Sequence, residues 1–178
     1  MVSYSDETNG DLRLAVYDGW SWESTAVDLE GEVGTHNSLT LLEFDRPAIS
    51  YYDATNGDLK FAVSGDWPGL PPPVVWTVTT VESAGDTGRD TWLSVVYGQP
   101  AISYRGADGT LQYTRFDGAS WQNALIDADS DAGWTTCLNI LPLGRPTISH
   151  WHVGVGLGFS WHDGTSWHTA HVDRKSVV

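Results

Sequence analysis

Apolar and polar residues alternate along short stretches of this chain, and stretches of this kind recur throughout its length. The segments 101–104 (Ala-Ile-Ser-Tyr) and 111–113 (Leu-Gln-Tyr) follow a period of two, as pleated strands with two different faces require. No window shows the sustained period of an amphipathic helix. The pattern therefore predicts an all-β protein made of many short strands.

A phrase of about a dozen residues occurs four times and leads each time to a tryptophan, which we expect in the core. The copies start 47, 53 and 46 residues apart, a spacing typical of propeller blades and solenoid coils. A parallel β-helix needs shorter coils and a stacked column of asparagine or glycine, which the sequence lacks. The copies are 2–15, 49–62, 102–114 and 148–160, and the tryptophans are Trp22, Trp76, Trp121 and Trp167.

Each complete repeat divides into four strand-like pieces, which is the content of one propeller blade. An Asp-Gly pair, a strong hairpin signal, stands between the third and fourth pieces at 18–19, 117–118 and 163–164. The second copy has a proline-rich insertion at 67–73 in that place, and we expect an extended surface loop there because proline cannot donate to a sheet. In the third copy the four pieces are 92–97, 99–104, 109–115 and 121–127.

The sequence thus predicts one β-propeller repeat domain over 1–178, with about four four-stranded blades. The first copy lacks the strand that corresponds to 93–96 in the third copy. We therefore expect an incomplete first blade, and either a partial propeller or a protomer that completes its ring as a homo-oligomer. The blades are expected at approximately 1–29, 30–83, 84–128 and 129–173.

Charge narrows the range of partners. The chain has 23 acidic and 9 basic residues, a formal net charge of −14, which argues against binding to nucleic acid or to an anionic membrane surface. No run of about 18 apolar residues is present to span a bilayer. The start of this chain shows no signal-peptide pattern; an extracellular or cell-surface location is favoured, and the compartment stays open.

Most of the acidic residues fall in two sets of loops that the propeller order brings to one face. These loops join the second strand to the third, and the fourth strand to the first strand of the next blade. A rim of this kind attracts cations and presents many hydrogen-bond acceptors. Asp53 and Asp58, from the first set, are candidate ligand-binding residues.

Three carboxylates alternate at Asp127, Asp129 and Asp131, ahead of Gly133. Ca²⁺ prefers six to eight oxygen ligands, and this spacing resembles the start of a calcium loop. Ala132 occupies the glycine position of that pattern, and no bidentate glutamate follows at the expected distance. A solvated turn is the favoured interpretation; Ca²⁺ is the only candidate cofactor, and none is firmly indicated.

The fourth copy concentrates histidines, and His150 and His152 share one strand face. Two imidazoles at this spacing suit a transition metal, although no third ligand is fixed, and histidines packed beside Trp151 are the alternative. Trp134 and Trp151 do not recur with the period, so each either stacks on a sugar ring or fills a gap between blades. Arg105, at the end of a second strand, completes the set of candidate ligand-binding residues.

The segment 108–121 (DGTLQYTRFDGASW) resembles the repeats of bacterial β-propellers that include tectonin-like and fucose-lectin-like proteins. In fucose lectins an arginine, a glutamate and a tryptophan from adjoining blades hold the sugar. The position of the glutamate is Tyr113 here, with Phe61 and Phe159 equivalent. The resemblance therefore implies a lectin-like role without that particular fucose site.

A second and more distant resemblance is to sialidase propellers, through 160–167 (SWHDGTSW), which is similar to a degraded Asp-box. No Ser/His/Asp spacing or phosphate loop is present. The sequence leads to a noncatalytic binding module for a glycan or small polar ligand, most plausibly lectin-like. A sialidase- or glycosidase-like fragment and a protein-interaction scaffold are the alternatives.

Overall fold

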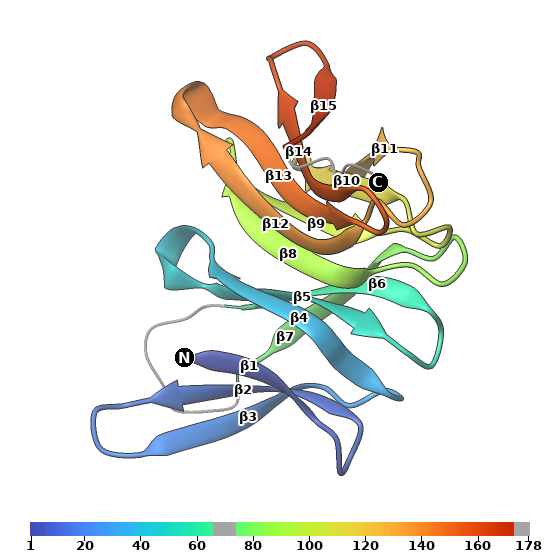
Figure 1. Ribbon diagram of the computed structural model, residues 1–178. Coiled ribbons are helices and arrows are strands. Elements are labelled where there is room, and N and C mark those ends of the chain that lie inside the picture. Colours follow the sequence, from blue (N-terminus) through green and yellow to red (C-terminus); the bar gives the residue numbers. More distant parts are fainter. Residues whose placement is uncertain (66–73, 173–178) are drawn as a thin grey trace. The chain divides into compact units, whose positions relative to one another are not determined.

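The computed structural model describes residues 1–65 and 74–172, and the proline-rich insertion at 67–73 lies outside the described residues. The described chain is built almost wholly of antiparallel strands (Figure 1). Two short 3₁₀ turns, η1 (Glu43–Asp45) and η2 (Pro142–Gly144), each join two neighbouring strands of the same sheet. None of the described residues forms a helix with the length and apolar character that crossing a membrane demands.

Each sheet is a meander in which every strand pairs with its neighbours in sequence. The first sheet has three strands and the others have four, as the missing strand of the first copy predicts. The first sheet contains β1 (Val2–Asp6), β2 (Asp11–Tyr17) and β3 (Trp22–Asp28); the second contains β4 (Val33–Leu41), β5 (Pro47–Asp53), β6 (Asp58–Ser64) and β7 (Trp76–Glu82). The third contains β8 (Arg89–Val96), β9 (Gln99–Arg105), β10 (Leu111–Phe116) and β11 (Trp121–Asp127); the fourth contains β12 (Trp134–Leu141), β13 (Arg145–His152), β14 (Gly156–His162) and β15 (Trp167–His171).

The chain forms two compact units, residues 1–89 and 90–178. Each unit has a core of buried residues from two successive sheets, because alternate apolar side chains of one sheet find cover only against the next. Repeated positions are the most deeply buried, and Leu12, Leu59 and Leu111 are all fully inaccessible to solvent. The cores comprise Leu12, Leu14, Val27, Val33, Ile49, Tyr51 and Ala62 in the first unit, and Val96, Ala101, Leu111, Tyr113, Ala132, Leu138 and Ile148 in the second.

The recurrent tryptophans only partly fulfil the expectation that they are core residues. Trp76 and Trp167 are half-buried and pack against the cores of their units. Trp22 is 57 % exposed, so the prediction is wrong there. The reason is that Trp167 contacts Tyr113 of the preceding sheet, with ring centroids 5.0 Å apart, whereas Trp22 packs against Tyr17 of its own hairpin, which is itself 51 % exposed.

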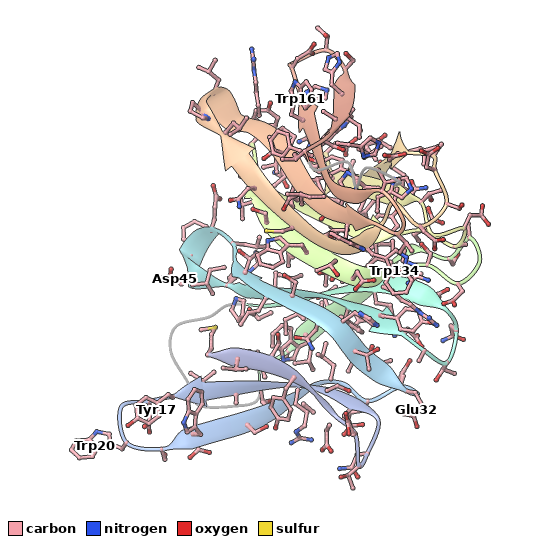
Figure 2. The ribbon with its side chains drawn as sticks, in the orientation of Figure 1. Tyr17, Trp20, Glu32, Asp45, Trp134 and Trp161 are labelled. Atoms are coloured by element: carbon pink, nitrogen blue, oxygen red, sulfur yellow. The ribbon has the colours of Figure 1, made fainter. Side chains whose placement is uncertain are left out.

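The Asp-Gly pairs form the tight hairpin turns that the sequence predicts. Asp18 Oδ1 accepts hydrogen bonds from the backbone N–H groups of Trp20 and Ser21, and Gly19 has φ = 104°, a conformation that favours glycine. Asp117 and Asp163 accept the same pair of bonds in their turns. The first of these turns exposes Tyr17 and Trp20 at the end of the β2–β3 hairpin (Figure 2).

Two glycines of the first unit allow the cost of backbone strain to be measured apart from the cost of crowding. Gly34 (φ = 97°) and Gly19 (φ = 104°) have similar conformations, but a Cβ atom at Gly34 would lie 2.9 Å from Leu12 Cα, and one at Gly19 would meet nothing within 4 Å. We expect Gly34→Ala to lower the free energy of unfolding by about 3 kcal/mol, from strain and overpacking together. The strain alone, in Gly19→Ala, should cost about 1 kcal/mol. Urea unfolding followed by tryptophan fluorescence measures both losses, and equal losses would contradict the close packing of the first two sheets.

Candidate functional site

In each unit, the two sets of acidic loops lie together at one end of the strands, as the sequence predicts. In the first unit the Val33 N–H donates to the Gly10 carbonyl, and the Ala54 N–H donates to the Glu32 carbonyl, both at 2.8 Å. The loop after β3 is therefore held between the β1–β2 and β5–β6 turns. In the second unit, equivalent bonds run from Gly133 to Gly109 and from Val153 to Asp131.

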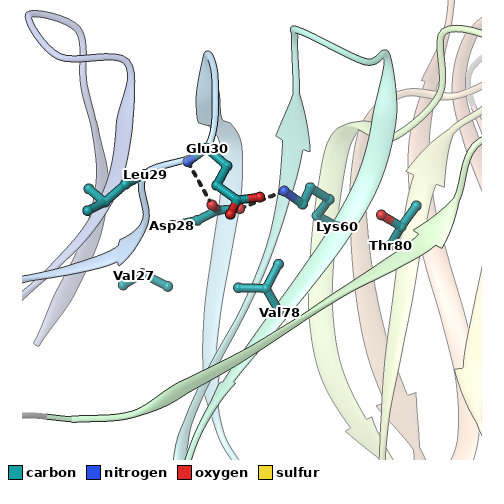
Figure 3. Close-up of a pocket in the computed structure, with 7 residues that line it drawn as sticks. All are labelled: Val27, Asp28, Leu29, Glu30, Lys60, Val78 and Thr80. Atoms are coloured by element: carbon teal, nitrogen blue, oxygen red, sulfur yellow. Dashed lines mark hydrogen bonds and ion pairs between the residues drawn. The ribbon is translucent and has the colours of Figure 1, made fainter.

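A pocket of about 580 Å³ opens beside this rim, between the end of β3 and strands β6 and β7 (Figure 3). Its volume is in the range of small-molecule sites, which combine apolar walls with a few fixed polar groups. Both kinds of group are present here. The apolar lining is Val27, Leu29 and Val78, and the polar lining is Asp28, Glu30, Lys60 and Thr80.

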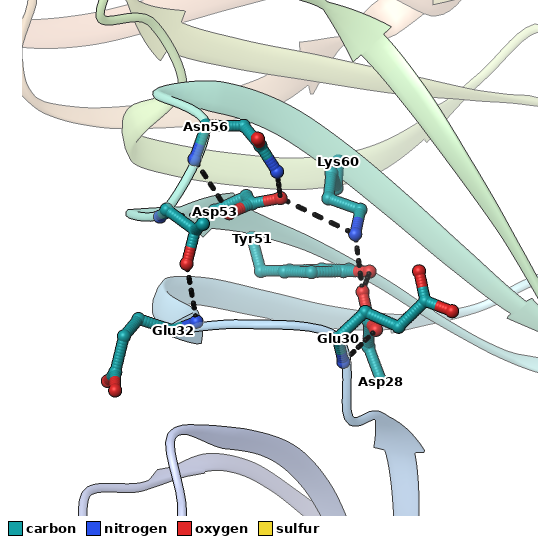
Figure 4. Close-up of polar contacts among 8 residues, drawn as sticks. Asp28, Glu30, Glu32, Tyr51, Asp53, Asn56 and Lys60 are labelled. Atoms are coloured by element: carbon teal, nitrogen blue, oxygen red, sulfur yellow. Dashed lines mark hydrogen bonds and ion pairs between the residues drawn. The ribbon is translucent and has the colours of Figure 1, made fainter.

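Lys60 is the centre of a buried polar network at the back of the pocket (Figure 4). Its Nζ lies 2.7 Å from Asp28 Oδ2 and 3.5 Å from Asp53 Oδ2. The Tyr51 hydroxyl donates to Asp28 Oδ2 at 2.6 Å. The side chains of Lys60, Asp28 and Asp53 are only 10 %, 4 % and 1 % exposed, so this network ties the first sheet to the second away from bulk water.

The network keeps Asp28 ionised. Burial by itself disfavours the carboxylate, but hydrogen bonds from Lys60 and Tyr51 outweigh burial and lower the pKa of Asp28 below its ordinary value. Burial likewise opposes the charge on Lys60, yet the hydrogen bond to Asp28 raises the pKa of Lys60. The pocket therefore has an ammonium and carboxylates at fixed positions.

Of the two predicted rim carboxylates of this region, Asp53 lies deeper than expected for a direct ligand contact, and Asp58 is half-buried. Asp53 Oδ1 accepts from the backbone N–H groups of Thr55 and Asn56, and Asp53 Oδ2 accepts from Asn56 Nδ2. Asp53 thus shapes its turn and holds Lys60. Asp58 is the register partner of Asp53, and burial followed by the charge of Asp53 raises the pKa of Asp58.

The sequence prediction missed Lys60, which is the one basic side chain among the described residues that line the pocket. The signal was a lysine in the otherwise apolar strand Leu59-Lys60-Phe61, opposite Tyr51 in the register. Arg13, Gln112 and Gly158 occupy the same position in the other copies. Because the position varies, the repeat comparison alone did not mark it.

Three of the predicted binding residues come together in the second unit. The Arg105 guanidinium lies 3.9 Å from the centroid of the Trp134 ring, a favourable cation–π distance. The Trp134 indole N–H donates to Asp131 Oδ1 at 3.2 Å, and Trp151 is the register partner of Trp134. Trp151 is 44 % exposed, so an indole open to solvent stands on the strand that pairs with the strand of the arginine-held Trp134.

The first unit has a related trio with the cation and the aromatic ring exchanged. Arg89 lies 4.9 Å from the centroid of the Tyr52 ring, and its Nη2 lies 3.0 Å from Asp86 Oδ2. The Tyr52 hydroxyl donates to Asp86 Oδ1. In the repeat alignment Tyr52 corresponds to Arg105 and Arg89 corresponds to Trp134. An arginine, an aromatic ring and an aspartate therefore recur at this position of the rim.

His150 and His152 lie on the same face of β13 and are buried, and Trp151 faces the opposite way. His150 uses both ring nitrogens, since Nδ1 lies 2.7 Å from the Ala132 carbonyl and Nε2 lies 3.3 Å from Ser160 Oγ. Burial lowers the pKa of His150 more than its bond to Ala132 raises it. His150 is thus a neutral structural residue at pH 7.

The alternating aspartates make turn contacts. Asp127 Oδ1 accepts from the Asp129 N–H at 3.0 Å, and Asp131 accepts from Trp134. Within residues 1–65 and 74–172, no group of three or more His, Cys, Asp or Glu side chains is arranged to hold a metal ion. The calcium site at Asp127, Asp129 and Asp131 stays a prediction.

The three positions equivalent to the lectin glutamate carry aromatic side chains. Phe61 and Tyr113 are buried, and Phe159 stacks on Trp161 with ring centroids 5.9 Å apart. Burial raises the pKa of the Tyr113 hydroxyl far above its ordinary value. A sugar site in this chain must therefore use other residues.

Comparison with known proteins gives a fold and no family. No protein-family model matches the chain, and no curated protein matches it. Among solved structures, AofleA from Arthrobotrys oligospora is 16 % identical with a TM-score of 0.64, over 94 % of this chain and 55 % of that one. The SapL1 lectin in complex with α-methyl fucoside is 12 % identical with a TM-score of 0.62, over 96 % and 59 %.

The Aleuria aurantia lectin, a fungal lectin with a six-bladed β-propeller fold and a novel mode of fucose recognition, is 19 % identical with a TM-score of 0.60, over 93 % of this chain and 54 % of that one. At these identities the likeness shows the fold alone. It confirms the prediction of a partial β-propeller. The chain spans somewhat more than half the length of these lectin chains.

Removing the ammonium should destabilise the first unit. Lys60→Met leaves Asp28 and Asp53 buried without their cation, so we expect a loss of about 3–5 kcal/mol in the free energy of unfolding. Tyr51→Phe removes a single hydrogen bond to Asp28 and should cost about 1.5–3 kcal/mol. Urea denaturation at neutral pH measures both changes.

Arg13→Met is the matched control, because Arg13 occupies the same repeat position but its side chain is 27 % exposed beside Asp11. The loss in its free energy of unfolding should be within about 1 kcal/mol.

The stability that Asp28 contributes should depend on pH with a definite sign. The pKa of Asp28 is lowered in the folded protein, so this stability is complete above the unfolded pKa and disappears as pH falls through the folded pKa. A Lys60→Met protein as stable as the Arg13→Met protein would refute the buried network.

Proposed function

We propose that this chain is a noncatalytic carbohydrate-binding module and that the pocket between β3 and strands β6 and β7 binds the sugar. The observation that carries the proposal is one pocket of about 580 Å³ with an apolar wall and fixed charged groups. A pyranose has the complementary chemistry, since its edge carries hydroxyl groups and its faces carry C–H groups. Val27 and Val78 suit the C–H face, and Asp28, Glu30 and Lys60 suit the hydroxyls.

Preorganisation supports this role. Lys60 is held by Asp28 and Asp53, and an ammonium has three N–H donors, so one donor remains for a ligand hydroxyl. Asp28 Oδ1 also accepts from the Glu30 backbone N–H at 3.0 Å, which fixes the turn that carries the Glu30 side chain. Binding then requires little ordering of side chains, which favours affinity for a small ligand.

The fold likeness suggests the first sugar to try. SapL1 is described in complex with α-methyl fucoside, and the Aleuria aurantia lectin by its fucose recognition. For this chain the analogy rests on fold alone. We therefore take α-methyl fucoside as the first probe and a glycan array as the wider one.

The second unit supports an additional sugar contact of a different kind. Arg105 holds Trp134 in place, and the neighbouring Trp151 is exposed. Indole rings stack on the C–H face of sugars, because they offer a large flat apolar surface. The polar pocket of the first unit and the exposed indole of the second unit both favour glycan binding, because a sugar offers hydroxyl groups as well as an apolar C–H face.

Glu30→Gln tests the pocket with little risk to the fold, since the bond to Asp28 comes from the Glu30 backbone and not from its carboxylate. Losing a charged acceptor for a sugar hydroxyl should weaken binding about tenfold. Isothermal titration calorimetry with α-methyl fucoside, or with the strongest sugar from the array, measures the change. Glu23→Gln is the control, because Glu23 is exposed on β3 and does not line the pocket.

Four outcomes would count against the proposal. An array without any bound glycan argues against a lectin, and capture of a protein ligand would favour the interaction scaffold. Hydrolysis of an aryl glycoside or sialoside, lost when one rim carboxylate is replaced, would establish the glycosidase-like alternative. Equal affinities of the Glu30→Gln and parent proteins would move the sugar site away from this pocket.

Assembly of copies is part of the same proposal. The first sheet has three strands, and β1 pairs with β2 on one side. A strand from a second copy, added beside β1, would give this sheet the four strands of the others. Light scattering of the purified chain measures the mass, and a monomer at all concentrations would contradict this assembly.

A further inference from the structure

The fourth sheet places histidines where the second sheet builds the lysine network. In the second sheet, Tyr51 on β5 pairs with Lys60 on β6, which pairs with Thr80 on β7. In the fourth sheet the corresponding row runs from β13 through β14 to β15. Its members are His150, Gly158 and His171.

The acidic residue next to this row in the second sheet is also replaced by a histidine in the fourth. His152, two residues after His150, corresponds to Asp53, two residues after Tyr51. The ammonium of the second sheet thus has no counterpart in this row, since glycine replaces lysine, and imidazoles replace a phenol, a hydroxyl and a carboxylate. The fourth sheet therefore has imidazoles where the second sheet has a fixed cation and its neighbours.

Glycine is required at position 158 by the imidazole next to it. A Cβ atom there would lie 2.3 Å from His150 Cε1 and 2.5 Å from His150 Nε2, far inside van der Waals contact. Side chains of paired residues on adjacent strands lie on one face of a sheet, so His150 and His171 flank the bare backbone of Gly158. This leaves room for the His171 and His152 rings to approach each other.

His152 and His171 are the members of this group that are free to bind. Their ring centroids lie 5.6 Å apart, and His152 is 6 % exposed. The Nδ1 atoms of both are buried, and neither has a hydrogen-bond partner within the described part of the chain. A buried ring nitrogen without a partner is unfavourable, and His150 does not share this property because both its nitrogens are engaged.

The distance between the rings fits a shared metal ion. Two imidazoles that bind one tetrahedral ion at about 2.0–2.1 Å have ring centroids roughly 5 Å apart. Neutral imidazole is a preferred ligand of Zn²⁺, Ni²⁺ and Cu²⁺. We propose that His152 and His171 form a two-histidine site for a divalent transition-metal ion, whose remaining positions are filled by water or by oxygen atoms of an external ligand.

The electrostatic setting favours a cation. Asp127, at the end of β11, corresponds to Asp28, the carboxylate that pairs with Lys60 in the first unit. The whole chain carries a formal net charge of −14, which raises the local concentration of cations. A metal ion in the fourth sheet restores the positive charge that Lys60 supplies in the second.

Calorimetric titration of chelator-treated protein with Zn²⁺ and Ni²⁺ at neutral pH tests the site. We expect one ion to bind per chain. His152→Gln and His171→Gln each remove a ligand, so each should weaken binding by at least the roughly 10- to 100-fold that loss of an outer partner costs. His168→Gln is the matched control, because His168 is exposed and its Nε2 lies 2.7 Å from Asp163 Oδ2.

Nuclear magnetic resonance of the parent protein gives a readout that does not depend on the folding of a variant. Paramagnetic Ni²⁺ should broaden the imidazole signals of His152 and His171 first, and those of His162 and His168 only at higher concentrations. Absence of metal uptake by the parent would overturn the proposal. So would loss of uptake in the His168→Gln protein, or first broadening at His168, because either places the ion on the exposed hairpin.

Discussion

Burial of one sheet against the next is the constraint on which the rest of this molecule depends. A strand of alternating side chains has one apolar face, and within each unit that face finds cover only on the following sheet. Leu12 and Leu111, from the first sheet of each unit, belong to these cores and are fully buried. Within each unit, the same constraint brings the end of the first sheet's last strand beside the middle strands of the second sheet. The apolar packing of the sheets therefore sets the positions of the polar residues at this junction.

The junction tolerates very different chemistry on one backbone. In the first unit, Lys60 lies between buried carboxylates and fixes charges around a pocket. In the second unit, the equivalent row has His150 over a glycine, with His152 and His171 close together. The backbone pairing is the same in both, because register depends on strand hydrogen bonds and on buried apolar positions. Side chains that cross the junction are therefore free to specialise.

The rim shows the same division between scaffold and chemistry. Backbone hydrogen bonds from Val33 to Gly10 and from Gly133 to Gly109 hold the loops in equivalent places in the two units. On this common frame the cation–π pair reverses its members, with Arg89 over Tyr52 in one unit and Arg105 over Trp134 in the other. What is retained is a flat ring fixed by a guanidinium.

The sequence by itself determined the repeat, the strands, the missing strand of the first sheet and the Asp-Gly turns, because each depends on residues close together in the chain. It also named Arg105, Trp134 and Trp151 as candidate binding residues, and that role stays a prediction. It did not find Lys60 or the pair His152–His171, and it wrongly expected Trp22 in the core. Only the tertiary structure decided these, because Lys60 meets Asp28 across 32 positions of sequence, and such contacts depend on how the sheets pack.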